Sequence, residues 1–167
     1  MKRYIDFNTN HADFLAISQE VLNRGAFLRF RAHGSSMNPF VKNGNILIIE
    51  PLNGISVNIG DVVFYHRSDR SLIAHRLVKI NVQKGEPHLI TRGDSLNYFD
   101  PPVQSWQMIG RVVEIENGQK HLRLSKWSGR IFGFLVALSE RGRYPHQRRV
   151  TRNLGRLWWL IGGKMIK

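Results

Sequence analysis

Between residues 26 and 116 the sequence is a series of short apolar segments separated by turn-forming residues. In the first segment Leu28, Phe30 and Ala32 alternate with Arg29 and Arg31, and this period of two is typical of a half-buried strand. Further strands are expected at residues 46–49, 62–65, 73–80, 88–91 and 108–115, with turns at 53–54 and 59–61. Many short strands with Gly-rich turns and little helix predict a mainly β fold, built as a small folded-over barrel or sheet.

Amphipathic segments flank this β region on both sides. Residues 10–24 have apolar side chains at helical spacing, and Gly25 suits the position just after a helix. Residues 126–141 and 152–166 also have helical spacing, although their glycines disfavour regular helices. We therefore divide the chain into a short N-terminal helix (1–25), a β domain (26–120) and a basic helical C-terminal extension (121–167). Within the β domain, Trp106 follows a Pro-containing loop and is expected to cover an edge of the core.

The net charge of +13 is concentrated near the C-terminus. Residues 126–167 contain 10 Lys and Arg against one acidic residue, whereas residues 1–125 contain 15 Lys and Arg against 11 Asp and Glu. Such a basic segment is attracted to anionic lipid head groups or to nucleic-acid phosphates. No apolar run approaches the roughly 20 residues that span a bilayer, and no leader-like segment follows Lys2 and Arg3. We expect neither a signal peptide nor a transmembrane anchor.

The absence of certain residue types and spacings excludes several kinds of chemical site. The chain has no cysteine, which excludes disulfides, a thiol nucleophile and Cys-based zinc sites. Its seven histidines show no metal-ligand spacing such as H-E-x-x-H. We therefore expect no metal and no cofactor.

Three residue types that could cooperate in nucleophilic catalysis occur in chain order, each beside strand-like sequence. They are Ser36, then His75, then the carboxylates Asp94 and Asp100. A serine hydroxyl needs a positioned base, and the base benefits from a carboxylate that fixes its tautomer. Histidine suits the base because it titrates near neutral pH. The residue types alone do not distinguish a nucleophilic Ser36 from an ordinary serine in a loop.

Four segments together resemble the type I signal peptidase family. Residues 34–39 (Gly-Ser-Ser-Met-Asn-Pro) are similar to its Ser-Met-x-Pro nucleophile box, and residues 60–65 (Gly-Asp-Val-Val-Phe-Tyr) to its Gly-Asp-Val-Val strand. Residues 75–78 (His-Arg-Leu-Val) lie where bacterial members have lysine and the endoplasmic-reticulum and archaeal branch has histidine. Residues 91–94 (Thr-Arg-Gly-Asp), with Asp100 six positions after Asp94, resemble the Gly-Asp-Asn box. The resemblance covers residues 30–115 and is closer to the Ser-His-Asp branch.

The resemblance implies a role for each of these residues. Ser36 would form the acyl-enzyme, His75 would be the general base and Asp100 would orient it. Asp94 would be a second functional carboxylate that positions the loop or the base, with a plain turn residue as the alternative. Met37 would line the substrate groove, with a plain core position as the alternative.

The sequence also departs from the family pattern. A serine that commonly stands two positions before the nucleophile, available as an oxyanion donor, is here Gly34. Ser35 could substitute for it, or the second donor could come from elsewhere. Asn45 follows Gly44 where Gly-Asp is usual, and the family's N-terminal anchor is not found in the sequence.

These observations favour a serine endopeptidase of signal-peptidase type, which would cleave an extended leader or signal peptide after small residues. Its partner would be a peptide or protein substrate. Residues 126–167 could also make peripheral contact with an anionic membrane, or form a small helical subdomain packed on the β domain. We expect a peripheral membrane location, with a cytoplasmic one as the alternative.

The alternative function is a catalytically inactive or self-processing relative that binds peptides, membranes or DNA as a regulator, like the related self-cleaving repressor peptidases. Nucleic acid is not the expected partner. Those repressors use lysine as base, and the residues before the β region are too few for a helix-turn-helix.

Overall fold

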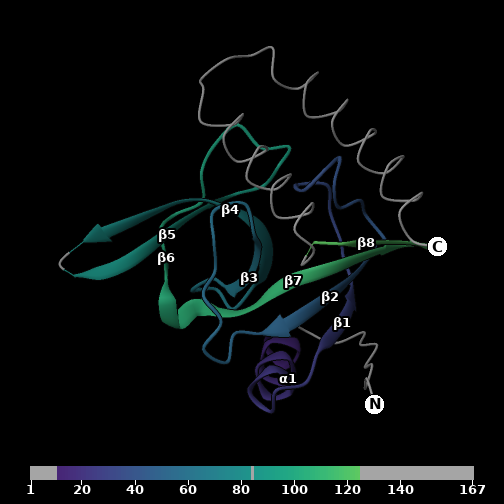
Figure 1. The fold of residues 1–167 in the computed structure, drawn as a ribbon, viewed down its shortest axis with the longest axis horizontal. Helices are drawn as coiled ribbons and strands as arrows, with labels where there is room; N and C mark the ends of the chain where they lie inside the picture. Colours follow the sequence, from purple (N-terminus) through teal and green to yellow (C-terminus); the bar gives the residue numbers. More distant parts are fainter. Residues whose placement is uncertain (1–10, 84, 125–167) are drawn as a thin grey trace.

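The computed structural model describes residues 11–83 and 85–124, which form one curled antiparallel sheet with a helix at its N-terminal end (Figure 1). Helix α1 (His11–Asn23) precedes β1 (Leu28–Arg31), β2 (Ile46–Pro51), β3 (Val62–His66), β4 (Leu72–Gln83) and β5 (Glu86–Arg92). The short strand β6 (Val103–Gln104), the single-turn 3₁₀ helix η1 (Ser105–Gln107), β7 (Met108–Asn117) and β8 (Lys120–Arg123) follow. The mainly β prediction is confirmed; the predicted helical extension lies outside the described residues.

The strands are ordered β1-β2-β7-β3-β4-β5-β6, and β8 also pairs with β7. Long β7 joins the two halves, because it pairs with β2 on one side and with β3 and β8 on the other. Register shifts at Ile48/Ile49, Phe64/Tyr65 and Leu77/Lys79 interrupt the ladders. Such irregularities increase the local bend of a strand and help a sheet to curl.

The curled sheet encloses two apolar clusters. The larger one collects side chains from α1, β1, β2, β3 and β7, including Leu22, Phe64 and Ile115. The smaller one is built from Val63, Tyr65, Leu77, Leu89 and Val103. Successive strand residues point to opposite faces, so neighbouring residues on β3 and β4 contribute to different clusters.

Helix α1 and the glycine that follows it are found where the sequence predicted them. Gly25 has a φ of 74°, which glycine adopts without strain, and its N–H donates to the Leu22 carbonyl at 2.9 Å. Helix α1 packs on the sheet through Leu15 and Leu22, which are buried. In the described residues, no helix is long and apolar enough to cross a membrane.

The prediction for Trp106 is wrong. Its side chain is 70% exposed on η1, where it contacts the His66 ring at 5.4 Å between centroids. The β sheet also continues three residues past the boundary expected at residue 120, because β8 ends at Arg123.

Candidate active site

Ser36 lies in the long loop between β1 and β2, and this loop is fastened to the loop that follows β5. The Ser36 carbonyl accepts hydrogen bonds from the Ser95 N–H and the Ser95 hydroxyl, both at 2.9 Å. A Cβ on Gly93 would lie 2.6 Å from the same carbonyl oxygen. Glycine is therefore required at position 93 for the two loops to approach this closely.

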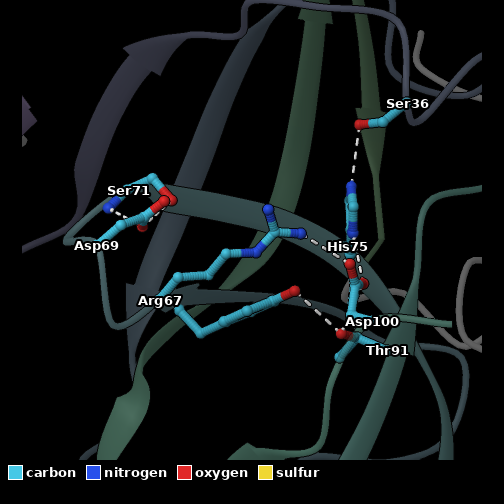
Figure 2. A network of polar contacts seen from close by, with 8 residues as sticks. Ser36, Arg67, Asp69, Ser71, His75, Thr91 and Asp100 are labelled. Atoms are coloured by element: carbon cyan, nitrogen blue, oxygen red, sulfur yellow. Dashed lines mark hydrogen bonds and ion pairs between the residues drawn. The ribbon is translucent and has the colours of Figure 1, made fainter.

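His75 lies at the centre of the site and joins Ser36 to Asp100 (Figure 2). Its Nε2 is 2.9 Å from the Ser36 hydroxyl oxygen, and its Nδ1 is 2.6 Å from Asp100 Oδ2. A carboxylate can only accept, so Nδ1 carries the proton and Nε2 is left to accept from the Ser36 hydroxyl. The three residues form one continuous hydrogen-bonded chain.

Strand register explains why His75 points to this side of the sheet. His75 pairs with Val63 across β3 and β4, and it therefore shares a face with the smaller apolar cluster. Thr91 pairs with Leu77 across β4 and β5 and belongs to the same face. Tyr65, two residues after Val63, lies there as well. The neighbouring strands β3, β4 and β5 thus bring Tyr65, His75 and Thr91 together.

Asp100 is buried and receives several hydrogen bonds. His75 and the Thr91 hydroxyl (2.9 Å) donate to its Oδ2, and Arg67 Nη2 (2.9 Å) donates to its Oδ1. Its own N–H donates to the Thr91 carbonyl at 2.9 Å. Burial alone would raise the pKa of Asp100, but the hydrogen bond and charge of His75, the Thr91 hydroxyl and the Arg67 charge together lower it below its usual value. Asp100 is therefore a stable carboxylate at neutral pH.

Tyr65 extends the network behind Thr91. The Tyr65 and Thr91 hydroxyl oxygens are 3.1 Å apart. Because the single Thr91 hydroxyl proton is directed to the Asp100 carboxylate, Tyr65 donates and Thr91 accepts. Burial raises the pKa of Tyr65, so the phenol keeps the proton that this bond needs.

The structure shows no hydrogen bond between Asp94 and His75. It forms a two-pronged ion pair with Arg76, with Nε to Oδ1 at 2.8 Å and Nη2 to Oδ2 at 2.6 Å. Arg76 Nη1 also donates to the Gly60 carbonyl at 2.8 Å. Arg76 follows His75 on β4 and therefore projects from the opposite face. The structure thus groups Ser36, His75 and Asp100 and places Asp94 with Arg76.

The other two predicted site residues have different environments. Met37 is 4% exposed and packs in the larger apolar cluster, and its role in a substrate groove stays a prediction. Ser35 is exposed, and its carbonyl accepts from the Ser95 hydroxyl at 2.8 Å. Its role as second oxyanion donor also stays a prediction.

Four residues of this network had no assigned role in the sequence. They are Tyr65, Arg67, Thr91 and Ser95. Tyr65 and Thr91 could have been found by pairing the predicted strands, because both fall on the His75 face. Arg67 lies in the connection between β3 and β4, and Ser95 lies in the loop after β5. Outside strands and helices, the sequence pattern does not predict the direction of a side chain.

The described residues also contain a surface group that could hold a metal ion, away from the predicted chemistry. Glu114, Glu116 and His121 offer ligand atoms within 4.8 Å of one another on β7 and β8. Glu116 is paired with Arg29 at 2.6 Å, and Arg123 lies 3.6 Å from Glu114. These ion pairs explain the cluster without a metal.

The chain is similar to one curated protein of known activity class. It is 32% identical over 95 aligned residues to the signal peptidase complex catalytic subunit sec11 of Schizosaccharomyces pombe. The match covers 39% of this chain and 50% of that protein, so the chain spans about half the length of the curated relative it matches. No family model and no solved structure matches the chain. This homology, together with the four segments that share the order of the family's boxes, supports a relationship to the type I signal peptidases of the endoplasmic-reticulum branch.

Proposed function

We propose that the protein is a serine endopeptidase that cleaves an extended leader or signal peptide after small residues. The observation that carries this proposal is the hydrogen-bonded chain from Ser36 Oγ through His75 to Asp100. An activated serine requires a base within hydrogen-bond reach and a third group that orients the base. The Sec11 homology supports the same activity class over part of the chain.

The proposed reaction starts when Ser36 Oγ attacks the scissile carbonyl while His75 Nε2 takes the hydroxyl proton. Asp100 stabilises the imidazolium that forms, and His75 then gives the proton to the leaving amine. The carbonyl carbon remains bonded to Ser36 Oγ as an ester until a water molecule, deprotonated by His75, releases the new carboxyl end. The Ser36 N–H would stabilise the oxyanion together with a second donor, for which Ser35 is the candidate.

Two substitutions test this mechanism directly. Ser36→Ala and His75→Ala should each abolish cleavage of a leader peptide with a small residue before the scissile bond, and Ser36→Ala should also abolish labelling by a fluorophosphonate. Ser68→Ala and His33→Ala are matched controls, because both side chains are exposed. Full cleavage by either active-site variant would refute the mechanism. A wild-type chain that folds but neither cleaves nor reacts would favour an inactive peptide-binding relative.

We further propose that the basic extension makes peripheral contact with anionic membranes. The basis is the 10 basic residues against one acidic residue in residues 126–167, since each cation near an anionic surface contributes about 1 kcal/mol. The full chain should co-sediment with vesicles containing phosphatidylserine at low salt, and a chain lacking residues 126–167 should not. Equal sedimentation of both chains would contradict this proposal.

A further inference from the structure

Arg67 and His75 both bind the Asp100 carboxylate (Figure 2). The two carboxylate oxygens of Asp100 have different partners: Oδ2 accepts from His75 and Thr91, and Oδ1 accepts from Arg67 Nη2. The Asp100 side chain is 2% exposed, whereas the Arg67 side chain is 40% exposed. A partly exposed guanidinium thus binds the carboxylate oxygen that His75 does not contact.

The turn between β3 and β4 fixes the backbone from which Arg67 projects. The Arg67 N–H donates to the Ser71 carbonyl at 2.9 Å, and the Arg67 carbonyl accepts from the Arg70 N–H at 3.0 Å. Asp69 accepts from both the N–H (2.9 Å) and the hydroxyl (2.6 Å) of Ser71. With its main chain held on both sides, Arg67 loses less conformational entropy when its side chain binds Asp100.

We propose that Arg67 is a positioning residue that holds the Asp100 carboxylate in the orientation that receives the His75 N–H. This inference rests on the proposed function. The physical reason is that the charged hydrogen bond from Arg67 fixes Oδ1, so that Oδ2 stays directed at His75 Nδ1.

The other groups around the His75 imidazole are neutral or lie on the opposite face of the sheet, so a change caused by removing the charge can be assigned to Arg67. The Ser36 and Thr91 hydroxyls and the Tyr65 phenol, whose pKa is raised by burial, are neutral in the working range. Arg76 and Arg92 pair with each other across β4 and β5 and project from the opposite face, where Asp94 binds Arg76. Among the described residues, Asp100 and Arg67 are therefore the charged members of this hydrogen-bonded network.

Removing the Arg67 charge should loosen the hydrogen bond between His75 and Asp100. In Arg67→Gln the His75 Nδ1 proton should exchange with solvent about tenfold faster than in wild type, because Oδ2 is no longer held toward it. The kcat of peptide cleavage should fall about tenfold through misplacement of Asp100, with KM nearly unchanged because Arg67 binds Asp100.

The experiment follows the His75 Nδ1 proton of the full chain by NMR and measures kcat and KM of peptide cleavage. Arg67→Lys keeps the charge and should restore slow exchange of this proton, and Arg70→Gln on the same exposed turn removes one charge without touching Asp100. If Arg67→Gln does not fold, Arg67→Met, which keeps part of the aliphatic stem, permits the same measurement. Unchanged exchange of this proton in the folded neutral variant, or equally faster exchange in Arg70→Gln, would overturn the proposal.

The NMR measurement also separates this inference from the proposed function, because proton exchange does not depend on peptide cleavage. If the wild-type chain cleaves no peptide but exchange is still faster in Arg67→Gln and slow again in Arg67→Lys, the peptidase proposal fails and the positioning role of Arg67 stands. If cleavage depends on Ser36 and the exchange rate does not change in Arg67→Gln, only the inference about Arg67 fails.

Discussion

Asp94→Asn and Asp100→Asn should separate two carboxylates that the sequence places six residues apart. Asp94 is bound to Arg76, and Asp100 is bound to His75. We expect Asp94→Asn to lower the stability of the fold and to leave the rate per folded molecule within a few-fold of wild type. We expect Asp100→Asn to lower the rate per folded molecule by several orders of magnitude and to lower the stability of the fold less than Asp94→Asn does.

The magnitudes follow from burial and geometry. The side chains of Arg76 and Asp94 are 4% and 0% exposed and share two short hydrogen bonds. Removing one charge of a buried pair costs about 3–5 kcal/mol because the other charge stays buried, which lowers Tm by roughly 10–20 °C in a domain of this size. Asp100→Asn presents an amide N–H to His75 and favours the wrong tautomer, and the equivalent change in a serine protease lowers kcat about 10⁴-fold.

The assay combines thermal unfolding by circular dichroism with the rate of fluorophosphonate labelling, measured well below each Tm. A double-mutant cycle with Arg76→Met gives the coupling energy of the pair. The reasoning is refuted if Asp94→Asn keeps the wild-type Tm while labelling slows as much as in Asp100→Asn. That result would mean that Asp94, and not only Asp100, acts on His75.

Three further outcomes are expected. Gly93→Ala should cost about 1–3 kcal/mol and slow labelling, because its Cβ would lie 2.6 Å from the Ser36 carbonyl oxygen and the loops must separate; unchanged melting and labelling would contradict this. Ser95→Ala keeps the N–H bond to Ser36 but loses the hydroxyl, so unfolding should show a loss of about 1 kcal/mol with labelling slowed a few-fold, and faster labelling would be inconsistent with it. The folded pKa of Asp100 lies below its unfolded value of about 3.9, so its ionised form stabilises the fold above that pH and this contribution is lost below it. The Tm difference between wild type and Asp100→Asn, followed by calorimetry, should therefore shrink from pH 6 to pH 3, and a constant difference would rule this out.

Strands could be predicted where the pattern of apolar and polar side chains within a single segment is long enough to be recognised. The strands β1, β2, β3, β4, β5 and β7 were all expected from periodicity or apolar runs, and their observed ends differ by a few residues. β6 and β8 were not expected, because two and four residues carry too little periodicity and their strand character comes from pairing with β5 and β7. Trp106 was misjudged because a large aromatic side chain suggests burial, whereas η1 leaves it exposed.

The site could be predicted only in part. Ser36, His75 and Asp100 were identified through boxes that resemble a family, since residue types alone do not show that side chains meet. The contact of Arg67 with Asp100 was beyond sequence reasoning, because Arg67 is 33 residues away and reaches Asp100 only after β3 and β4 pair. The different partners of Asp94 and Asp100 could not be predicted either, because they depend on Arg76 and His75 projecting from opposite faces of β4.

The loop after β5 determines the geometry of the whole site. It carries Asp100, and through Gly93 and Ser95 it also holds the carbonyl of Ser36. His75, in contrast, is fixed by the ladder between β3 and β4. Nucleophile and orienting acid are therefore attached to one loop, and the base is attached to the sheet. A change in this loop should displace Ser36 and Asp100 together relative to His75, so that loop substitutions impair both hydrogen bonds of the imidazole at once.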